Sequence, residues 1–272
     1  MVRIFRSDIT CPGPTAGAVT TACTWFERTC SVWRSHWFSW RPDPQVARGL
    51  LGYGLRAHLG SIASLANVRL DQAIISILLP FGELGLYAVA VSLSGAVCLA
   101  ANTLAIVTFP HIASLSSMSE KERALGRFLR FALVLSVLAA ITTLWLAPWI
   151  LGLFFGADFL PATGVARVLI LASIPLGFNS ILTAGVKAMG HPLVSSLAEV
   201  IGLGVTGIAL WLLLPAYGIM GAAWASLLVY SFVGALMLFQ MRRIFELKLA
   251  ELFRPTSDDW RYVSDRVSTL LV

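Results

Sequence analysis

Long apolar stretches separated by short polar or proline- and glycine-containing breaks make up most of this sequence. Each stretch reaches the roughly 20 residues that an α-helix needs to cross a bilayer, and this length favours transmembrane helices over buried strands. The pattern predicts an all-α fold, a polytopic transmembrane helix bundle with about six spanning helices. These helices are expected at residues 58–79, 84–106, 128–154, 165–189, 193–214 and 219–240.

The breaks between the apolar stretches contain the residues that usually end or turn a helix. Pro80 and Gly82 follow the first stretch, and a charged loop at residues 119–127 leads into the third. Pro215 and Gly218 lie between the fifth and the sixth. Because proline lacks a backbone donor and glycine adopts turn conformations freely, these residues mark the predicted boundaries.

The chain is expected to have three parts. Residues 1–45 differ from the rest, with scattered prolines and cysteines and with tryptophans interleaved with arginines. They are interpreted as an interfacial segment among lipid headgroups, as a disordered extension, or as residues translated from a wrongly assigned start. Charged residues interrupt the first ten positions, so a secretory signal is not expected. Residues 46–240 form the predicted bundle, and residues 241–272 a polar cytoplasmic tail.

Composition supports a membrane protein. Of the 272 residues, 57% are hydrophobic and 12% are charged, whereas an average soluble domain has about 25% charged residues. The mean hydropathy is +0.80. A net charge of +6 could indicate a nucleic-acid partner, but the basic residues lie between the apolar stretches and near the C-terminus. This distribution favours contact with a membrane surface, and no nucleic-acid partner is expected.

Basic residues occur in alternate breaks, and this alternation predicts the orientation of the bundle. The breaks on the other side contain Glu83 and Asp158, with Arg167 at the start of the fourth helix. Because cytoplasmic loops are rich in lysine and arginine, both ends of the bundle are expected in the cytoplasm. The basic residues assigned to the cytoplasmic side are Arg48, Arg56, Lys121, Arg123, Arg127, Arg130, Lys187, Arg242, Arg243 and Lys248.

A polar group in the middle of the first predicted helix is a candidate functional site. It comprises Asn67, Arg69, Asp71 and Gln72. An ionisable side chain inside a membrane costs about 2.5–3.5 kcal/mol on insertion scales, so each needs a reason to be there. Arg69 and Asp71 are two residues apart and face different ways, so each is expected to find another partner. Either they line a polar cavity, where Arg69 attracts a phosphate and Asp71 holds a basic partner from another helix or binds a cation, or they form structural ion pairs between helices.

Other polar residues of the predicted helices are weighed as further candidates. Arg56 is expected at the cytoplasmic mouth of the first helix. Asn179 shares the middle of the fourth helix with Pro175, where a proline break indicates either a transport site or a plain kink. Lys187 is expected to extend to the lipid headgroups. Glu199 could meet Lys187 across the helical hairpin or be solvated from a cavity.

No enzyme, metal site or cofactor is predicted, and no catalytic residue is assigned. His58, His111 and His191 are dispersed at the ends of apolar stretches, without a carboxylate or cysteine at metal-ligand spacing. The glycines of residues 202–207 match the letters of a dinucleotide-binding loop. They lie inside an apolar stretch, however, where small residues favour close packing of helices.

The order of several short motifs resembles that of a known family. The motifs are Gly54-Leu-Arg56-Ala-His-Leu-Gly60, Asn67-Val-Arg69-Leu-Asp71, Gly85-Leu-Tyr87-Ala-Val-Ala-Val-Ser92, Phe109-Pro110-His111-Ile-Ala113, Ile181-Leu-Thr-Ala-Gly185-Val-Lys187-Ala-Met-Gly190-His-Pro192 and Tyr217-Gly218-Ile-Met-Gly221-Ala-Ala-Trp-Ala-Ser226. From about residue 46 to residue 260, the chain resembles the lipid-linked polysaccharide flippases of bacterial inner membranes. These O-antigen and exopolysaccharide translocases belong to the multidrug, oligosaccharidyl-lipid and polysaccharide exporter superfamily.

The resemblance implies a fold of two six-helix bundles around a central cavity, of which this chain matches the C-terminal bundle. It implies translocation of an undecaprenyl-pyrophosphate-linked oligosaccharide, with Arg69 and Arg56 at the anionic headgroup. Asp71 and Asn179 complete the set of expected substrate-binding residues. The expected partners are membrane lipid, the lipid-linked oligosaccharide, Na⁺ or H⁺, and a missing N-terminal bundle or a second copy. The alternatives are an ion-coupled multidrug exporter of the same superfamily and a non-transporting membrane remnant.

The predicted orientation can be tested with reporter fusions. A reporter fused within residues 119–127 should be active only as a cytoplasmic fusion, because this segment holds the densest group of basic residues between two spans. A fusion near Asp158 should behave as an external one. The opposite result for either fusion would contradict the topology.

Overall fold

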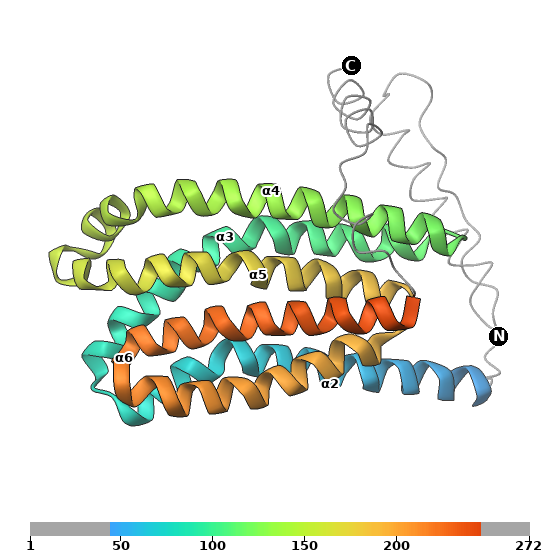
Figure 1. Cartoon of the computed structure of the whole chain (residues 1–272), viewed down its shortest axis with the longest axis horizontal. Helices are drawn as coiled ribbons and strands as arrows, with labels where there is room; N and C mark the ends of the chain where they lie inside the picture. Colours follow the sequence, from blue (N-terminus) through green and yellow to red (C-terminus); the bar gives the residue numbers. More distant parts are fainter. Residues whose placement is uncertain (1–43, 246–272) are drawn as a thin grey trace, which may run out of the picture. The chain divides into compact units, whose positions relative to one another are not determined.

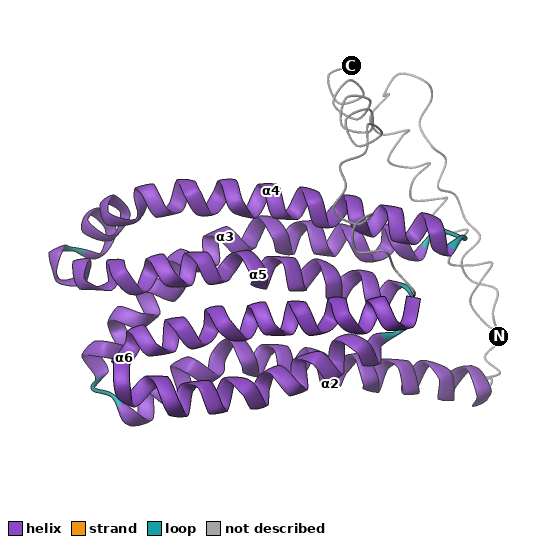
Figure 2. Ribbon diagram, in the orientation of Figure 1, coloured by secondary structure: helices purple, strands orange, loops and turns teal. Residues whose placement is uncertain are grey.

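The computed structural model describes residues 44–245, and regular structure within this range is helical, joined by short loops (Figure 2). A boundary between two units of the chain falls after Leu51, inside the first described helix, and the bundle is described from Gly52 on. The predictions for residues 1–43 and for the tail beyond residue 245 lie outside the described residues.

Five long helices account for most of the described range (Figure 1). A π-helical turn and a 3₁₀ turn join the third and fourth of them. The elements are α2 (Pro44–Leu78), α3 (Phe81–Ala113), α4 (Met118–Ile150), η1 (Leu151–Phe155), η2 (Ala157–Ala162), α5 (Thr163–Ala188) and α6 (Pro192–Phe245).

The last helix, α6, consists of two halves. The backbone leaves the helical conformation at Gly218, where φ is 57° and ψ is −142°, three residues after Pro215. Figure 1 shows the two halves running in opposite directions, in light and dark orange. Five helices in the described range are long and apolar enough to cross a membrane, and α6 does so as a hairpin. The prediction of an all-α bundle with about six spans is therefore confirmed.

Two expectations about helix ends and breaks are wrong. The charged segment at residues 119–127 is not a loop but the beginning of α4. Ser117 caps this helix, because its hydroxyl accepts from the backbone N–H of Glu120, whose carboxylate in turn accepts from the backbone N–H of Ser117. Pro175 does not interrupt α5, which is continuous from Thr163 to Ala188.

The centre of the bundle is α5, which has the largest buried share of the candidate spans. It packs against α3, α4 and α6, and its apolar side chains contribute to both hydrophobic clusters of the core. Large apolar side chains on the other helices point outwards, as Trp211 does with 76% of its surface exposed. In a membrane protein such side chains face lipid, so the exposed apolar surface agrees with a bilayer environment.

The helices α2 and α6 approach each other closely at Gly60. A Cβ atom at this position would lie 2.4 Å from the Oγ atom and 2.8 Å from the Cα atom of Ser196. The Ser196 hydroxyl donates to the backbone carbonyl of Arg56 at 2.6 Å. Only glycine therefore allows this contact, which brings the polar face of α2 against α6.

Replacing Gly218 should destabilise the bundle, because its backbone conformation is strained for any residue with a side chain. We expect Gly218→Ala to cost about 1–3 kcal/mol of folding free energy, seen as a lower unfolding temperature in detergent. Gly204→Ala is the matched control, since a Cβ at Gly204 meets no atom within 4 Å and helical alanine is favoured over glycine. Equal stability of the two variants would show that the turn tolerates a side chain.

Candidate functional site

The buried face of α2 carries polar as well as apolar side chains. Its buried positions recur every three or four residues, as expected for one face of a helix. Asn67 and Asp71 belong to this face, whereas Arg69 is exposed. The prediction that Arg69 and Asp71 face different ways is confirmed. The buried positions are Gly60, Ala63, Asn67, Asp71 and Ile75.

Asp71 is held by hydroxyl groups from two other helices. Its side chain is only 3% exposed, and its Oδ2 atom accepts from the hydroxyl of Tyr87 on α3 and from that of Ser226 on α6, the latter at 3.5 Å. Its Oδ1 atom accepts from the backbone N–H of Gln72 at 2.7 Å. Within residues 44–245, none of these partners is basic. The structural ion pair considered for Asp71 is therefore replaced by a carboxylate bound to neutral donors.

A second polar group lies closer to the N-terminal end of α2. The Thr206 hydroxyl of α6 donates to the Oδ1 atom of Asn67. The carboxylate of Glu199, also on α6, forms side-chain hydrogen bonds with Asn67 and Ser64. Both halves of α6 thus bind α2, the first through Asn67 and the second through Asp71.

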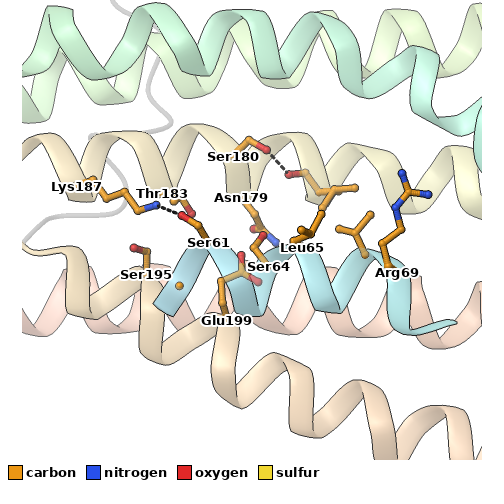
Figure 3. A pocket seen from close by; sticks show the side chains of 13 residues that line it. Ser61, Ser64, Leu65, Arg69, Asn179, Ser180, Thr183, Lys187, Ser195 and Glu199 are labelled. Atoms are coloured by element: carbon orange, nitrogen blue, oxygen red, sulfur yellow. Dashed lines mark hydrogen bonds between the residues drawn. The ribbon is translucent and has the colours of Figure 1, made fainter. Parts of the chain in front are cut away.

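Two adjoining cavities open beside these residues. The first, called here the Lys187 cavity, has a volume of about 450 Å³ and lies between α2, α5 and α6 (Figure 3). The second, called here the Asp71 cavity, has a volume of about 620 Å³ and lies mainly between α2, α3 and α5. The two cavities adjoin, because they share wall residues, and together they are called the groove here. The shared residues are Ser64, Val68, Arg69, Leu176 and Ser180.

Basic side chains lie toward the two ends of the Lys187 cavity. Figure 3 shows Lys187 and Arg69 on opposite sides of the drawn residues, with Glu199 between them. The Nη1 atom of Arg69 donates to the Oε1 atom of Gln72 at 3.0 Å. The Nζ atom of Lys187 donates to the Oγ atom of Ser61 on α2 at 3.3 Å. The Lys187 side chain thus reaches from α5 to α2, and its position at the lipid headgroups stays a prediction.

The structure brings three of the four predicted site residues to this groove. Arg69 lines both cavities, Asp71 lines one and Asn179 lines the other. Asn179 is 3% exposed and donates from Nδ2 to the backbone carbonyl of Tyr230 at 2.8 Å. Arg56 is exposed and is not among the lining residues of either cavity.

Sequence reasoning did not assign Lys187, Glu199 and Tyr87 to the site. For Lys187 and Glu199, the spacing of polar residues along the sequence could have indicated the site. Thr183 and Lys187 are four residues apart on α5, as are Ser195 and Glu199 on α6, so each pair shares one helix face. Tyr87 carried no such signal, because its role depends on the tertiary contact with Asp71.

Solved structures with the same fold are membrane transporters. A MATE transporter crystallised with MaD5 matches with a TM-score of 0.59 and 22% identity, over 81% of this chain and 52% of that chain. A MOP superfamily transporter from Pyrococcus furiosus matches with a TM-score of 0.53 and 19% identity, over 78% of this chain and 49% of that chain. The protein is thus a multi-pass membrane protein with the MOP superfamily fold, spanning about half the length of these structures.

A family described as polysaccharide biosynthesis protein matches residues 19–164, slightly more than half of the chain. The chain belongs to this polysaccharide biosynthesis protein family. It is also 26% identical over 194 residues to a probable low-salt glycan biosynthesis flippase, Agl15, of Haloferax volcanii, covering 70% of this chain and 41% of the relative. The resemblance to polysaccharide exporters is therefore confirmed. The prediction that the chain is not an enzyme agrees with a fold shared by transporters.

The contact between Tyr87 and Asp71 should contribute measurably to stability. Tyr87→Phe removes one donor from a buried carboxylate, so we expect a loss of about 1–3 kcal/mol, measured by thermal unfolding in detergent. Tyr217→Phe is the control, because Tyr217 is exposed. Asp71→Ala and Tyr87→Phe together should cost less than the sum of the single changes. Strict additivity would show that the two side chains do not interact.

Proposed function

We propose that this protein takes part in flipping an undecaprenyl-pyrophosphate-linked oligosaccharide across the bacterial inner membrane. The product would be used for lipopolysaccharide or exopolysaccharide synthesis. Membership of the polysaccharide biosynthesis protein family and the similarity to a probable glycan flippase support the class of substrate. The single observation that carries the proposal is the position of Arg69, an exposed guanidinium on the wall shared by both cavities.

Arg69 has the chemistry that a diphosphate headgroup requires. Its planar guanidinium presents paired N–H donors that match the oxygens of a phosphate. Within the described range, the side-chain acceptor of Arg69 is the neutral amide of Gln72 rather than a carboxylate. Its charge can therefore act on a ligand in the groove. Arg56, which is exposed on the same helix, is proposed to attract the headgroup before it enters.

The other parts of the substrate have different requirements. The polyprenyl chain is apolar and would remain in the lipid beside the bundle, whereas the sugars need hydrogen-bonding partners in place of water. The hydroxyl-lined Lys187 cavity, with Asn179 on its wall, supplies such partners. We propose that a second six-helix bundle, from an N-terminal half or a second copy, closes the groove during transport.

Asp71 is proposed to couple transport to a cation gradient. A buried carboxylate with neutral hydrogen-bond partners can take up a proton or Na⁺ without breaking an ion pair. The same feature favours the second candidate function, an ion-coupled exporter of cationic drugs, because Asp71 and Glu199 are acidic residues on the cavity walls. A drug exporter would lose drug resistance rather than surface polysaccharide when these residues are changed.

Replacing Arg69 in the chromosomal gene tests the proposal. Arg69→Ala should abolish most surface polysaccharide, because losing charge-assisted hydrogen bonds of about 1.5–3 kcal/mol weakens headgroup binding about tenfold or more. Arg69→Lys should retain part of the activity, since lysine keeps the charge but not the forked donors.

Arg123→Ala serves as the control, because Arg123 is exposed on α4 and lines neither cavity. Surface polysaccharide is measured by gel electrophoresis and staining, together with the amount of protein in the membrane. Normal polysaccharide in the Arg69→Ala strain at a normal protein level would reject headgroup binding by Arg69.

A further inference from the structure

The Lys187 end of the groove differs chemically from the Arg69 end. Lys187 reaches Ser61, which precedes Arg69 by eight positions on α2. At 1.5 Å per residue, the two positions are about 12 Å apart along the helix axis. A ligand group held by Arg69 therefore leaves room toward Lys187 for a further group of the same ligand.

The hydroxyl groups around Lys187 present acceptor oxygens to the cavity. Three serine hydroxyls donate their protons to carbonyls of their own helices: Ser61 to Ala57 at 3.1 Å, Ser180 to Leu176 at 3.3 Å and Ser195 to Pro192 at 3.0 Å. While a hydroxyl donates to its own helix in this way, it offers acceptor lone pairs to a ligand. These oxygens line the Lys187 cavity and call for a ligand with donors.

Glu199 and Lys187 add one acceptor group and one donor group of opposite charge. Both side chains line the Lys187 cavity, and their hydrogen bonds go to neutral side chains. Lys187 donates to Ser61, and Glu199 binds Ser64 and Asn67. Because the two charges cancel, this end exerts no net attraction on an anion. The carboxylate of Glu199 would repel a second phosphate or a carboxylate of the ligand.

We propose that the Lys187 end is a subsite for a neutral sugar, with Glu199 as the residue that selects against acidic sugars. A sugar hydroxyl both donates and accepts, so it can donate to Glu199 or to the serine oxygens and accept from Lys187. The carboxylate of an acidic sugar is itself an acceptor, so it cannot form hydrogen bonds with the acceptor oxygens of Glu199 and the serines. The inference rests on the proposed function, in which Arg69 holds the diphosphate of the same substrate.

Binding of three lipid probes to the full chain in nanodiscs tests this subsite. The probes are undecaprenyl diphosphate, the same lipid carrying galactose, and the same lipid carrying galacturonic acid, in which a carboxylate replaces one hydroxymethyl group. The galactosyl lipid should bind more tightly than the lipid without sugar and about tenfold more tightly than the galacturonyl lipid. A galacturonyl lipid that binds as tightly as the galactosyl lipid would overturn the proposal.

Two variants should change this selectivity in opposite directions. Glu199→Gln removes the repulsion, so the preference for galactose over galacturonic acid should fall about tenfold. Lys187→Met removes the positive charge that opposes Glu199, so the preference for the galactosyl over the galacturonyl lipid should rise. Asp158→Asn is the control, because Asp158 is exposed and lines neither cavity. If Glu199 and Lys187 had only a structural role, their replacement would weaken the binding of all three lipid probes equally.

The outcomes separate the inference from the proposed function. If undecaprenyl diphosphate itself does not bind, or binds equally well to Arg69→Ala, both are wrong. If it binds through Arg69 but neither variant alters the sugar preference, only the neutral-sugar subsite is wrong. Should Glu199→Gln fail to fold, the Lys187→Met variant still decides, because an unchanged preference in that variant contradicts the proposal.

Discussion

The structure depends on one constraint of the bilayer interior, where no water is available for buried polar groups. Each such group must bind another part of the protein or impose a cost of several kcal/mol. In this bundle, Asp71 finds hydroxyls on α3 and α6, and Asn67 finds Thr206 and Glu199 on α6. The polar face of α2 is thus bound to its neighbours by hydrogen bonds, and the groove lies beside this bonded face.

The number and type of helices could be predicted because the apolar length required by a bilayer is visible in any sequence. The start of α4 could not, since its charged first turns depend on the cap formed by Ser117 and Glu120 rather than on hydropathy. The opposite faces of Arg69 and Asp71 followed from helix geometry. The partners of Asp71 and the direction of Lys187 are tertiary contacts between distant segments, which one sequence does not encode locally.

The fold, the family and the groove bear on different aspects of function. The fold match to transporters below 25% identity establishes architecture alone. The family match narrows the biology to polysaccharide synthesis. The distribution of charge in the groove indicates which part of one substrate each subsite would bind. An unopposed guanidinium suits phosphate, whereas the balanced pair of Lys187 and Glu199 suits hydroxyl groups.

The sharp turn at Gly218 has a mechanical consequence. The two halves of α6 meet without a flexible linker, and each half is hydrogen-bonded to α2, through Thr206 on one side and Ser226 on the other. α2 is therefore hydrogen-bonded to both halves of the α6 hairpin. A tilt of α2 that preserved these bonds would have to carry both halves with it. Rearrangements that open or shut the groove would then displace α2 and both halves of α6 together.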